Sequence, residues 1–227
     1  MAELEHNRII KRAVSSVLKP NGLFQIGSSR TWIDDNGWFL TQVEFQPSGW
    51  DRGSCLNVGI YFPWRYDGSM GFDFSIGQCR VDDFVAFDGD EEKFFADMQG
   101  IANRALEKVE EYRKFRNPDY ACAVRLGSEY GTDVHKLYQK MMICGLCQDS
   151  RAVRYFEELR KLVHEPEFAW IQKIKDELDE AISPIIGDPQ ELYGYILEKI
   201  RKNRRTLREK TSMKKLKESF PFNGESL

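Results

Sequence analysis

The sequence is poor in the residues that mark most enzyme and metal sites. Its 227 residues include only 3 His and 5 Cys, and no apolar run approaches the ~18 residues that a membrane span needs. An odd, sparse set of cysteines does not suit a disulfide scaffold and is typical of a reducing compartment. The first dozen residues place acids where a secretory leader carries bases. We therefore expect a cytoplasmic protein without a membrane partner.

Sequence motifs for common chemistries are absent as well. The chain has no Walker-type phosphate loop, no G-x-G-x-x-G after a strand, no H-E-x-x-H pair and no G-x-S-x-G elbow. The histidines His6, His135 and His164 stand alone, which favours surface or capping roles. These absences weaken an enzyme interpretation without excluding it. The sequence predicts no catalytic residue, no cofactor and no metal ligand.

What the chain does contain is a globular composition with segregated charge. Apolar types make up 41% and charged types 30%, which is too apolar for a disordered chain. The basic segment, Lys199–Lys217, holds ten Lys or Arg and one acid. Its net of +9 leaves −12 on the rest of a chain whose total is −3. Asp82–Asp97 has seven acids against one Lys, so the modest total hides two oppositely charged regions.

The first half has the patterning of an α+β domain. Apolar residues at helical spacing predict an N-terminal helix that ends near Pro20. Asn36-Gly37 predicts a hairpin with a two-residue turn, and alternating residues predict further strands at Leu56–Phe62 and Phe72–Ile76. One apolar face per strand indicates an antiparallel β-sheet covered on one face by helices.

The covering helix is predicted at Asp90–Arg116. Its apolar stripe runs from Phe94 to Tyr112, with charged residues between. Asn117-Pro118 ends it, and a short strand is predicted at Tyr120–Leu126. We expect this sheet domain to occupy residues 1–126.

The second half, residues 127–227, is predicted to be a helical extension. Thr132–Cys147 and Ser150–His164 form an αα-hairpin, and Pro166 begins a third helix. Asp188 has the signature of a helix cap and begins a fourth. The apolar stripe of that helix thins after Ile200, so the basic segment is expected to be exposed and to contribute little stability.

Cys144-Gly145-Leu146-Cys147 is the one motif in the sequence whose cysteine spacing is typical of a redox or metal site. C-x-x-C serves as a redox dithiol or as half of a zinc site. Here it lies at the predicted end of a helix, where the dipole disfavours a thiolate. A zinc site needs two more ligands, and no second pair has the spacing. The sequence favours small residues that pack a helix–helix turn, with metal and redox roles as alternatives.

Two groups of residues are candidates for binding. Four of the five Trp lie in the first 64 residues, among arginines, and Trp50 and Trp64 adjoin loop signals. Tryptophan and arginine dominate interface hot spots. The predicted partner-binding residues are Trp50, Arg52, Trp64 and Arg65, although tryptophan also fills sheet cores.

The basic segment offers the second group. Its arginines and lysines could bind nucleic-acid phosphates by releasing counterions. The predicted phosphate-binding residues are Arg201, Lys202, Arg204, Arg205 and Arg208. A solvated helix end whose charge complements the acidic body is the alternative.

Short motifs in the first half resemble a known family. In order, they are Lys19-Pro20-Asn21-Gly22-Leu23, Arg30-Thr31-Trp32, Asn36-Gly37-Trp38, Phe45-Gln46-Pro47-Ser48 and Leu56-Asn57-Val58-Gly59-Ile60. Together they are similar to a bacterial family known as domain of unknown function four-three-zero-four, over roughly residues 5–125. Leu23 departs from the phenylalanine usual there. The resemblance implies a compact α+β domain and supplies no catalytic residues. Met141–Leu159 also resembles one tetratricopeptide-type hairpin, with Ala152 near its close-packing position.

These observations favour a non-enzymatic bacterial protein that binds another protein. A specific version is an immunity or antitoxin-like role, in which an acidic protein blocks a basic toxin. The first alternative is a nucleic-acid-associated protein that uses the basic segment. The second is an enzyme whose site is assembled from the loops near Trp50 and Trp64. The sequence leaves the oligomeric state open.

Overall fold

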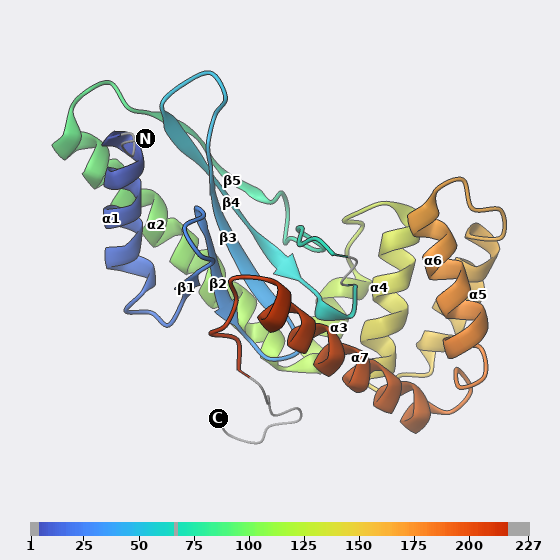
Figure 1. Cartoon of the computed structure of the whole chain (residues 1–227). Coiled ribbons are helices and arrows are strands. Elements are labelled where there is room, and N and C mark those ends of the chain that lie inside the picture. Colours follow the sequence, from blue (N-terminus) through green and yellow to red (C-terminus); the bar gives the residue numbers. More distant parts are fainter. Residues whose placement is uncertain (1–4, 66–67, 218–227) are drawn as a thin grey trace. The chain divides into compact units, whose positions relative to one another are not determined.

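A computed structural model describes residues 5–65 and 68–217 (Figure 1). These residues form a five-stranded antiparallel sheet and seven α-helices, which confirms the α+β fold class with a helical C-terminal region. They divide into two compact units. Unit 1 comprises residues 5–114 and 204–217 of the described chain, and unit 2 comprises residues 115–203. Among the described helices, none is both long and apolar enough for a membrane span.

Unit 1 is built on a sheet whose strands follow one another in chain order. The strands are β1 (Phe24–Gln25), β2 (Thr31–Asp35), β3 (Leu40–Gln46), β4 (Gly53–Tyr61) and β5 (Arg80–Ala86). Each pairs antiparallel with the next, so the sheet is a meander with β1 and β5 at its edges. Every residue of the interior strand β4 is buried, which means that both faces of the sheet are covered there.

The predicted hairpin forms, but its turn is longer than expected. β2 and β3 pair with Asp35 opposite Leu40, so four residues connect them. Gly37 takes the positive φ of +82° that the Asn-Gly signal predicts. The Asn36 backbone N–H donates to the Phe39 carbonyl at 3.1 Å, and the Asn36 amide donates to the Asp34 carboxylate at 2.9 Å. These bonds hold Asn36 in a buried position and place it outside the ladder.

The strand predicted at Phe72–Ile76 is wrong. That segment makes one isolated bridge, between Phe74 and Ile60, and the paired strand is β5. Phe72 and Phe74 instead lie close over β4. A Cβ on Gly59 would come within 2.8 Å of the Phe72 ring and 2.9 Å of the Phe74 carbonyl oxygen. The alternating phenylalanines therefore indicate packing against β4 and not a full ladder.

Two helices cover one face of the sheet. α1 (Glu5–Leu18) and α2 (Glu91–Arg113) lie side by side there (Figure 1). The predicted stripe of α2 is buried throughout, from Phe94 to Tyr112. The Asp90 side chain caps α2 by accepting a hydrogen bond from the Lys93 backbone N–H at 3.0 Å. This element is confirmed as predicted.

The C-terminal part of the chain covers part of the opposite face, which the sequence did not predict. Leu207, Met213 and Leu216 are buried in a cluster with residues of the first four strands. The strand residues in this cluster are Phe24, Ile33, Leu40 and Tyr61. The expectation that the basic segment is exposed therefore fails for these apolar residues, whereas several of its cations are exposed.

Unit 2 is helical. Its helices are α3 (Pro118–Leu126), α4 (Asp133–Leu146), α5 (Arg151–Leu162), α6 (Ala169–Glu177) and the first part of α7 (Pro189–Lys210). A π-helical turn, Leu178–Ile182, extends α6. The αα-hairpin of α4 and α5 is confirmed. The division into units differs from the predicted boundary at residue 126, because unit 2 begins at Phe115 and α7 passes into unit 1 at Arg204.

The strand predicted at Tyr120–Leu126 is wrong, because those residues lie in α3. The Asn117 side chain accepts a hydrogen bond from the Tyr120 backbone N–H at 3.1 Å, and Pro118 occupies the first turn. Asn-Pro is therefore a helix start here as well as a stop for α2. The cap predicted for α7 is confirmed, because Asp188 accepts from the backbone of Gln190 at 2.8 Å. α4 begins with a cap as well, in which Thr132 accepts from the backbone of His135.

Candidate functional site

The structure separates the predicted partner-binding residues. Trp50 is 96% exposed and Arg52 is exposed, as expected for loop residues. Trp64 is only 1% exposed, so its assignment to a binding surface is wrong. Its ring stacks on Phe62, with 4.5 Å between centroids, and on Trp38 at 5.8 Å. Arg65 forms an ion pair with the buried Asp73.

Trp50 is exposed on an ordered turn between β3 and β4. The Ser48 hydroxyl oxygen accepts hydrogen bonds from the backbone N–H groups of Trp50, at 3.0 Å, and Asp51, at 3.2 Å. Gly53 ends the loop with φ +150°, and a Cβ there would meet the Val85 carbonyl oxygen at 2.1 Å. Only glycine allows this close approach to β5, so the base of the loop is anchored while Trp50 faces solvent.

An acidic turn lies beside this loop. The Phe87 backbone N–H donates to the Arg52 carbonyl at 2.8 Å, which joins the β3–β4 loop to the turn that leads into α2. We call residues 47–52 and 87–92 together the loop surface. Its exposed acids are Asp51, Asp88, Asp90, Glu91 and Glu92. The loop surface therefore presents one large apolar side chain, Trp50, within a mainly acidic border.

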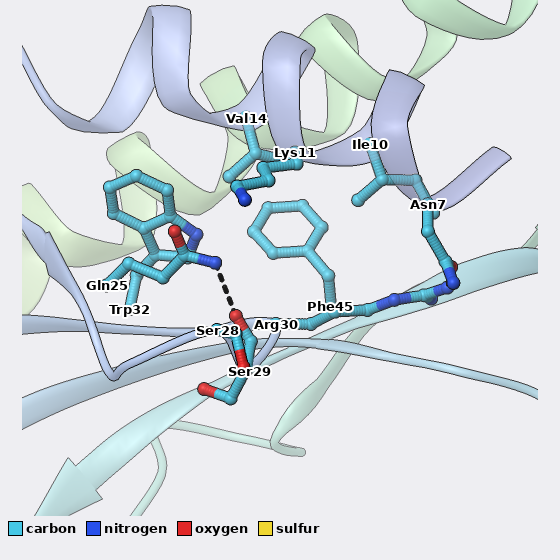
Figure 2. Close-up of a pocket in the computed structure, with 10 residues that line it drawn as sticks. All are labelled: Asn7, Ile10, Lys11, Val14, Gln25, Ser28, Ser29, Arg30, Trp32 and Phe45. Carbon is cyan, nitrogen blue, oxygen red and sulfur yellow. Dashed lines mark hydrogen bonds between the residues drawn. The ribbon is translucent and has the colours of Figure 1, made fainter. Parts of the chain in front are cut away.

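A small cavity lies between α1 and the sheet (Figure 2). Figure 2 shows the Phe45 ring beneath α1, with Arg30 extending toward Asn7. The apolar side chains that line it are buried: Ile10 and Val14 from α1, and Trp32 and Phe45 from the sheet. The polar side chains that line it are more exposed: Asn7, Lys11, Gln25, Ser28, Ser29 and Arg30.

Arg30 links this cavity to the base of the Trp50 loop. Its Nη1 donates to the Gly53 carbonyl at 3.0 Å, and its Nη2 donates to the Asn7 side chain. Burial lowers the pKa of Arg30. Burial, with smaller contributions from the charges of Arg30 and Arg52, also lowers the pKa of His6. His6 is therefore biased toward its neutral form near this corner of unit 1.

The size of the cavity bears on the enzyme alternative. Its volume is about 100 Å³, whereas small-molecule sites usually span about 300–1,000 Å³. Because Trp64 is buried in the core and Trp50 is exposed, the two loops do not present both tryptophans on one surface.

The predicted phosphate-binding residues also divide. Arg204 is 2% exposed, so its assignment to phosphate binding is wrong. Its guanidinium donates to both carboxylate oxygens of Asp35, at 2.8 and 2.9 Å, and to the backbone carbonyls of Gly37 and Lys217, each at 2.8 Å. Arg201, Lys202 and Arg205 are exposed, and Arg208 is half-buried.

Lys199, the first cation of the basic segment, is also used within the protein. In unit 2 its ammonium pairs with Glu177 and donates to the Tyr138 hydroxyl at 3.1 Å. Tyr195 donates to the same Glu177 carboxylate at 2.8 Å. Burial lowers the pKa of Lys199, although the Glu177 charge opposes that shift. This network joins α4, α6 and α7, and we interpret it as structural.

The C-x-x-C motif meets a third cysteine that the sequence analysis did not connect with it. Cys122, on α3, lies against the end of α4, where its sulfur is near those of Cys144 and Cys147. One carboxylate oxygen of Asp149 and the sulfurs of Cys122 and Cys144 all lie within 4.8 Å of one another. We call Cys122, Cys144, Cys147 and Asp149 the thiol cluster. Cys122 carries no spacing signal, so only folding could reveal it.

The electrostatics of the thiol cluster follow from its shared protons. Hydrogen bonds from Cys144 and Cys147 lower the pKa of Cys122, because donated S–H groups stabilise a thiolate. The same bonds, together with burial, raise the pKa of Cys144 and Cys147. Cys122 and Cys144 are buried and Cys147 is half-buried, beside the Pro118 carbonyl at 3.4 Å.

Comparisons with known proteins add no assignment to these sites. No family model, no curated protein and no solved structure matches the chain. The resemblance of the first half to domain of unknown function four-three-zero-four therefore stays a prediction.

Proposed function

We propose that this chain is a non-enzymatic, bacterial cytoplasmic protein that binds another protein through the loop surface. The observation that carries the proposal is the 96% exposure of Trp50 at the end of an anchored turn. Tryptophan is among the residues that most often dominate binding energy at protein interfaces. The hydrogen bonds at Ser48 and the tight glycine at position 53 support the proposal further, because a pre-ordered loop loses little entropy on binding.

The charge around Trp50 indicates a basic partner. Glu91 and Glu92 are exposed in the first turn of α2, next to Asp88. Acids at a helix N-terminus also stabilise the helix, so these residues have a structural role besides. Their field would attract a cationic surface and speed the encounter. This suits the immunity or antitoxin-like version, in which the chain blocks a basic protein toxin.

A photo-crosslinking experiment tests this surface in cells of the source organism. A photoreactive phenylalanine analogue replaces Trp50 in one variant and Phe168 in the other. Phe168 is a matched control because it is a 57% exposed aromatic residue that belongs to unit 2 and not to the loop surface. We expect one dominant protein adduct from position 50 that position 168 does not give.

The identified partner then permits a binding measurement. Trp50→Ala should weaken its affinity by about 30-fold or more, as expected for a hot spot of ~2 kcal/mol. The double reversal Glu91→Lys and Glu92→Lys should slow association, most strongly at low salt. Identical adduct patterns at positions 50 and 168, or a partner whose affinity ignores Trp50→Ala, would contradict the proposal.

Nucleic-acid binding is the second candidate, because exposed cations remain in the basic segment. Within unit 1, the exposed cations of the basic segment include Arg205, Lys214, Lys215 and Lys217. If they contact duplex phosphates, log affinity should fall with log salt by about 0.9 per contact. Binding that shows no salt dependence, or is unchanged in a Lys214→Ala, Lys215→Ala variant, would remove this candidate.

A further inference from the structure

Three cysteines and one aspartate from separate parts of unit 2 converge at the end of α4. Cys144 and Cys147 come from its last turn, Cys122 comes from α3, and Asp149 follows in the turn before α5. The sulfurs of Cys122 and Cys144 and an oxygen of Asp149 lie within 4.8 Å of one another. The Cys147 sulfur lies outside this group of three and donates a hydrogen bond to the Pro118 carbonyl at 3.4 Å, so it would join the other ligands by a side-chain rotation.

The local backbone explains why Asp149 turns back toward the cysteines. The Asp149 N–H donates to the Cys144 carbonyl at 2.8 Å, and the Gln148 N–H donates to the Gly145 carbonyl at 3.1 Å. This pair of bonds is the Schellman motif that ends many helices. The motif needs a left-handed residue, usually glycine, at the position of Gln148.

Gln148 has φ +54°, the only positive φ at a non-glycine among the described residues. A left-handed conformation is unfavourable for a residue that carries a Cβ. Gln148 therefore adopts a conformation that glycine adopts more easily. Because the chain turns back at Gln148, Asp149 lies close to Cys144. An uncommon backbone conformation next to a cluster of ligand-type side chains is typical of a functional site.

The separations of Cys122, Cys144 and Asp149 suit three corners of a tetrahedral metal centre. A Zn–S bond of about 2.3 Å in tetrahedral geometry sets the sulfurs about 3.8 Å apart. The 4.8 Å limit met by Cys122, Cys144 and Asp149 is within small side-chain rotations of that value. Four protein ligands would complete the coordination, as in structural zinc sites.

From this arrangement we propose that the thiol cluster binds Zn²⁺ or a similar thiophilic divalent cation. Cys122, Cys144 and Cys147 supply thiolate ligands, and Asp149 supplies one carboxylate oxygen. Soft sulfur ligands select zinc over Mg²⁺ and Ca²⁺, which prefer oxygen. The site is closed and therefore structural, and it links α3, α4 and the turn before α5.

The surroundings of the thiol cluster suit a bound cation. Arg151 donates to both oxygens of Asp149, at 2.9 and 3.0 Å through its Nε, and orients the carboxylate. A carboxylate has about four lone-pair sites, so this pairing leaves capacity for a metal bond. Cys122 and Cys144 are shielded from water, while the Asp149 side chain is 23% exposed and provides an entry route.

Metal content of the full chain tests the proposal. The protein is purified with reductant, its affinity tag is removed, and zinc is measured per chain by elemental analysis and native mass spectrometry. We expect one zinc per chain in the unmodified protein and in Cys79→Ser. Cys79 is a matched control, because it is a free cysteine of unit 1. Cys122→Ser and Cys144→Ser should lose the stoichiometric zinc.

Two further measurements keep the proposal falsifiable if the cysteine variants fail to fold. Asp149→Asn keeps the side-chain shape and should weaken zinc binding by at least about tenfold. Cobalt added to the unmodified apoprotein should give the thiolate charge-transfer and tetrahedral d–d absorption bands.

Two results would overturn the proposal. One is a failure of the binding test: reduced, unmodified protein binds neither zinc nor cobalt stoichiometrically, or a folded Cys122→Ser variant still binds zinc as the unmodified protein does. The other is a disulfide at Cys122 in protein whose thiols were blocked at lysis, since that would identify a redox pair in place of a metal centre.

Discussion

At the residue scale, Arg204 shows how a charged side chain can become part of the core. Its guanidinium pairs with both oxygens of Asp35, and the Lys217 backbone N–H donates to the same carboxylate at 2.9 Å. The Arg204 and Asp35 side chains are 2% and 8% exposed. An intact buried ion pair stabilises the fold little more than apolar side chains of similar volume would. Removing one partner is costly, however, because it leaves the other charge buried without a counter-charge.

Arg204→Ala should therefore destabilise the protein by about 3–5 kcal/mol, the usual cost of breaking a buried pair. The measurement is the free energy of unfolding in denaturant. Arg205→Ala is the matched control, because Arg205 is the adjacent arginine and is exposed, and it should stay within about 0.5 kcal/mol of the unmodified protein. Equal effects of the two substitutions would show that Arg204 is not buried in solution.

At the element scale, the packing of α4 against α7 within unit 2 depends on Gly145. A Cβ at this position would lie 2.6 Å from Ile196 Cδ1 and 2.7 Å from Leu192 Cδ2. Both of those side chains are buried, so they have little room to move. The glycine inside the C-x-x-C motif therefore lets two helices approach closely, in addition to spacing the cysteines.

Gly145→Ala should destabilise the protein by about 1–2 kcal/mol, because the overpacking cost of roughly 1–3 kcal/mol exceeds a helix-propensity gain of up to about 1 kcal/mol. Gly194→Ala, on an exposed part of α7 with nothing within 4 Å of the added Cβ, should have the opposite sign. Thermal unfolding of both variants compares them directly. A stabilising Gly145→Ala would mean that α4 and α7 are less closely packed than described.

At the scale of the whole molecule, unit 1 is assembled from two distant parts of the chain. Residues 5–114 form the sheet and two helices, and residues 204–217 return to the face opposite those helices. The 14 residues from Arg204 to Lys217 supply Leu207, Met213 and Leu216 to the core. A sheet domain that stops at residue 126 therefore lacks part of its own core.

The fragment 1–126 should accordingly lack a cooperative thermal transition and should bind an apolar dye. It would leave Ile33, Leu40 and Tyr61 without their partners from the C-terminal segment. Adding residues 204–217 through a long glycine-serine linker should restore cooperative unfolding, and the same linked chain carrying Leu207→Asp should not unfold cooperatively. A cooperatively folded fragment 1–126 would show that the C-terminal segment is dispensable for unit 1.

The helices and the hairpin that have local sequence signals could be predicted from the sequence alone. The helix starts near Asp90 and Thr132, the cap at Asp188, the buried stripe of α2 and the hairpin at Asn36-Gly37 all depend on residues a few positions apart. Those positions interact in any chain that adopts the element, so periodicity and capping rules predict them. The α+β class followed from these elements.

Contacts between side chains that are far apart in the sequence could be identified only from the folded structure. Trp50 and Trp64 have similar loop signals, yet one is exposed and the other lies in an aromatic stack. Asp35 and Arg204, like Cys122 and the C-x-x-C motif, come together only after the chain folds. A single sequence carries no spacing rule for such pairs, because their contact depends on how whole elements pack. The candidate metal centre and the packing of Arg204, Leu207, Met213 and Leu216 into unit 1 were therefore beyond sequence reasoning, whereas the exposed loop at Trp50 was within it.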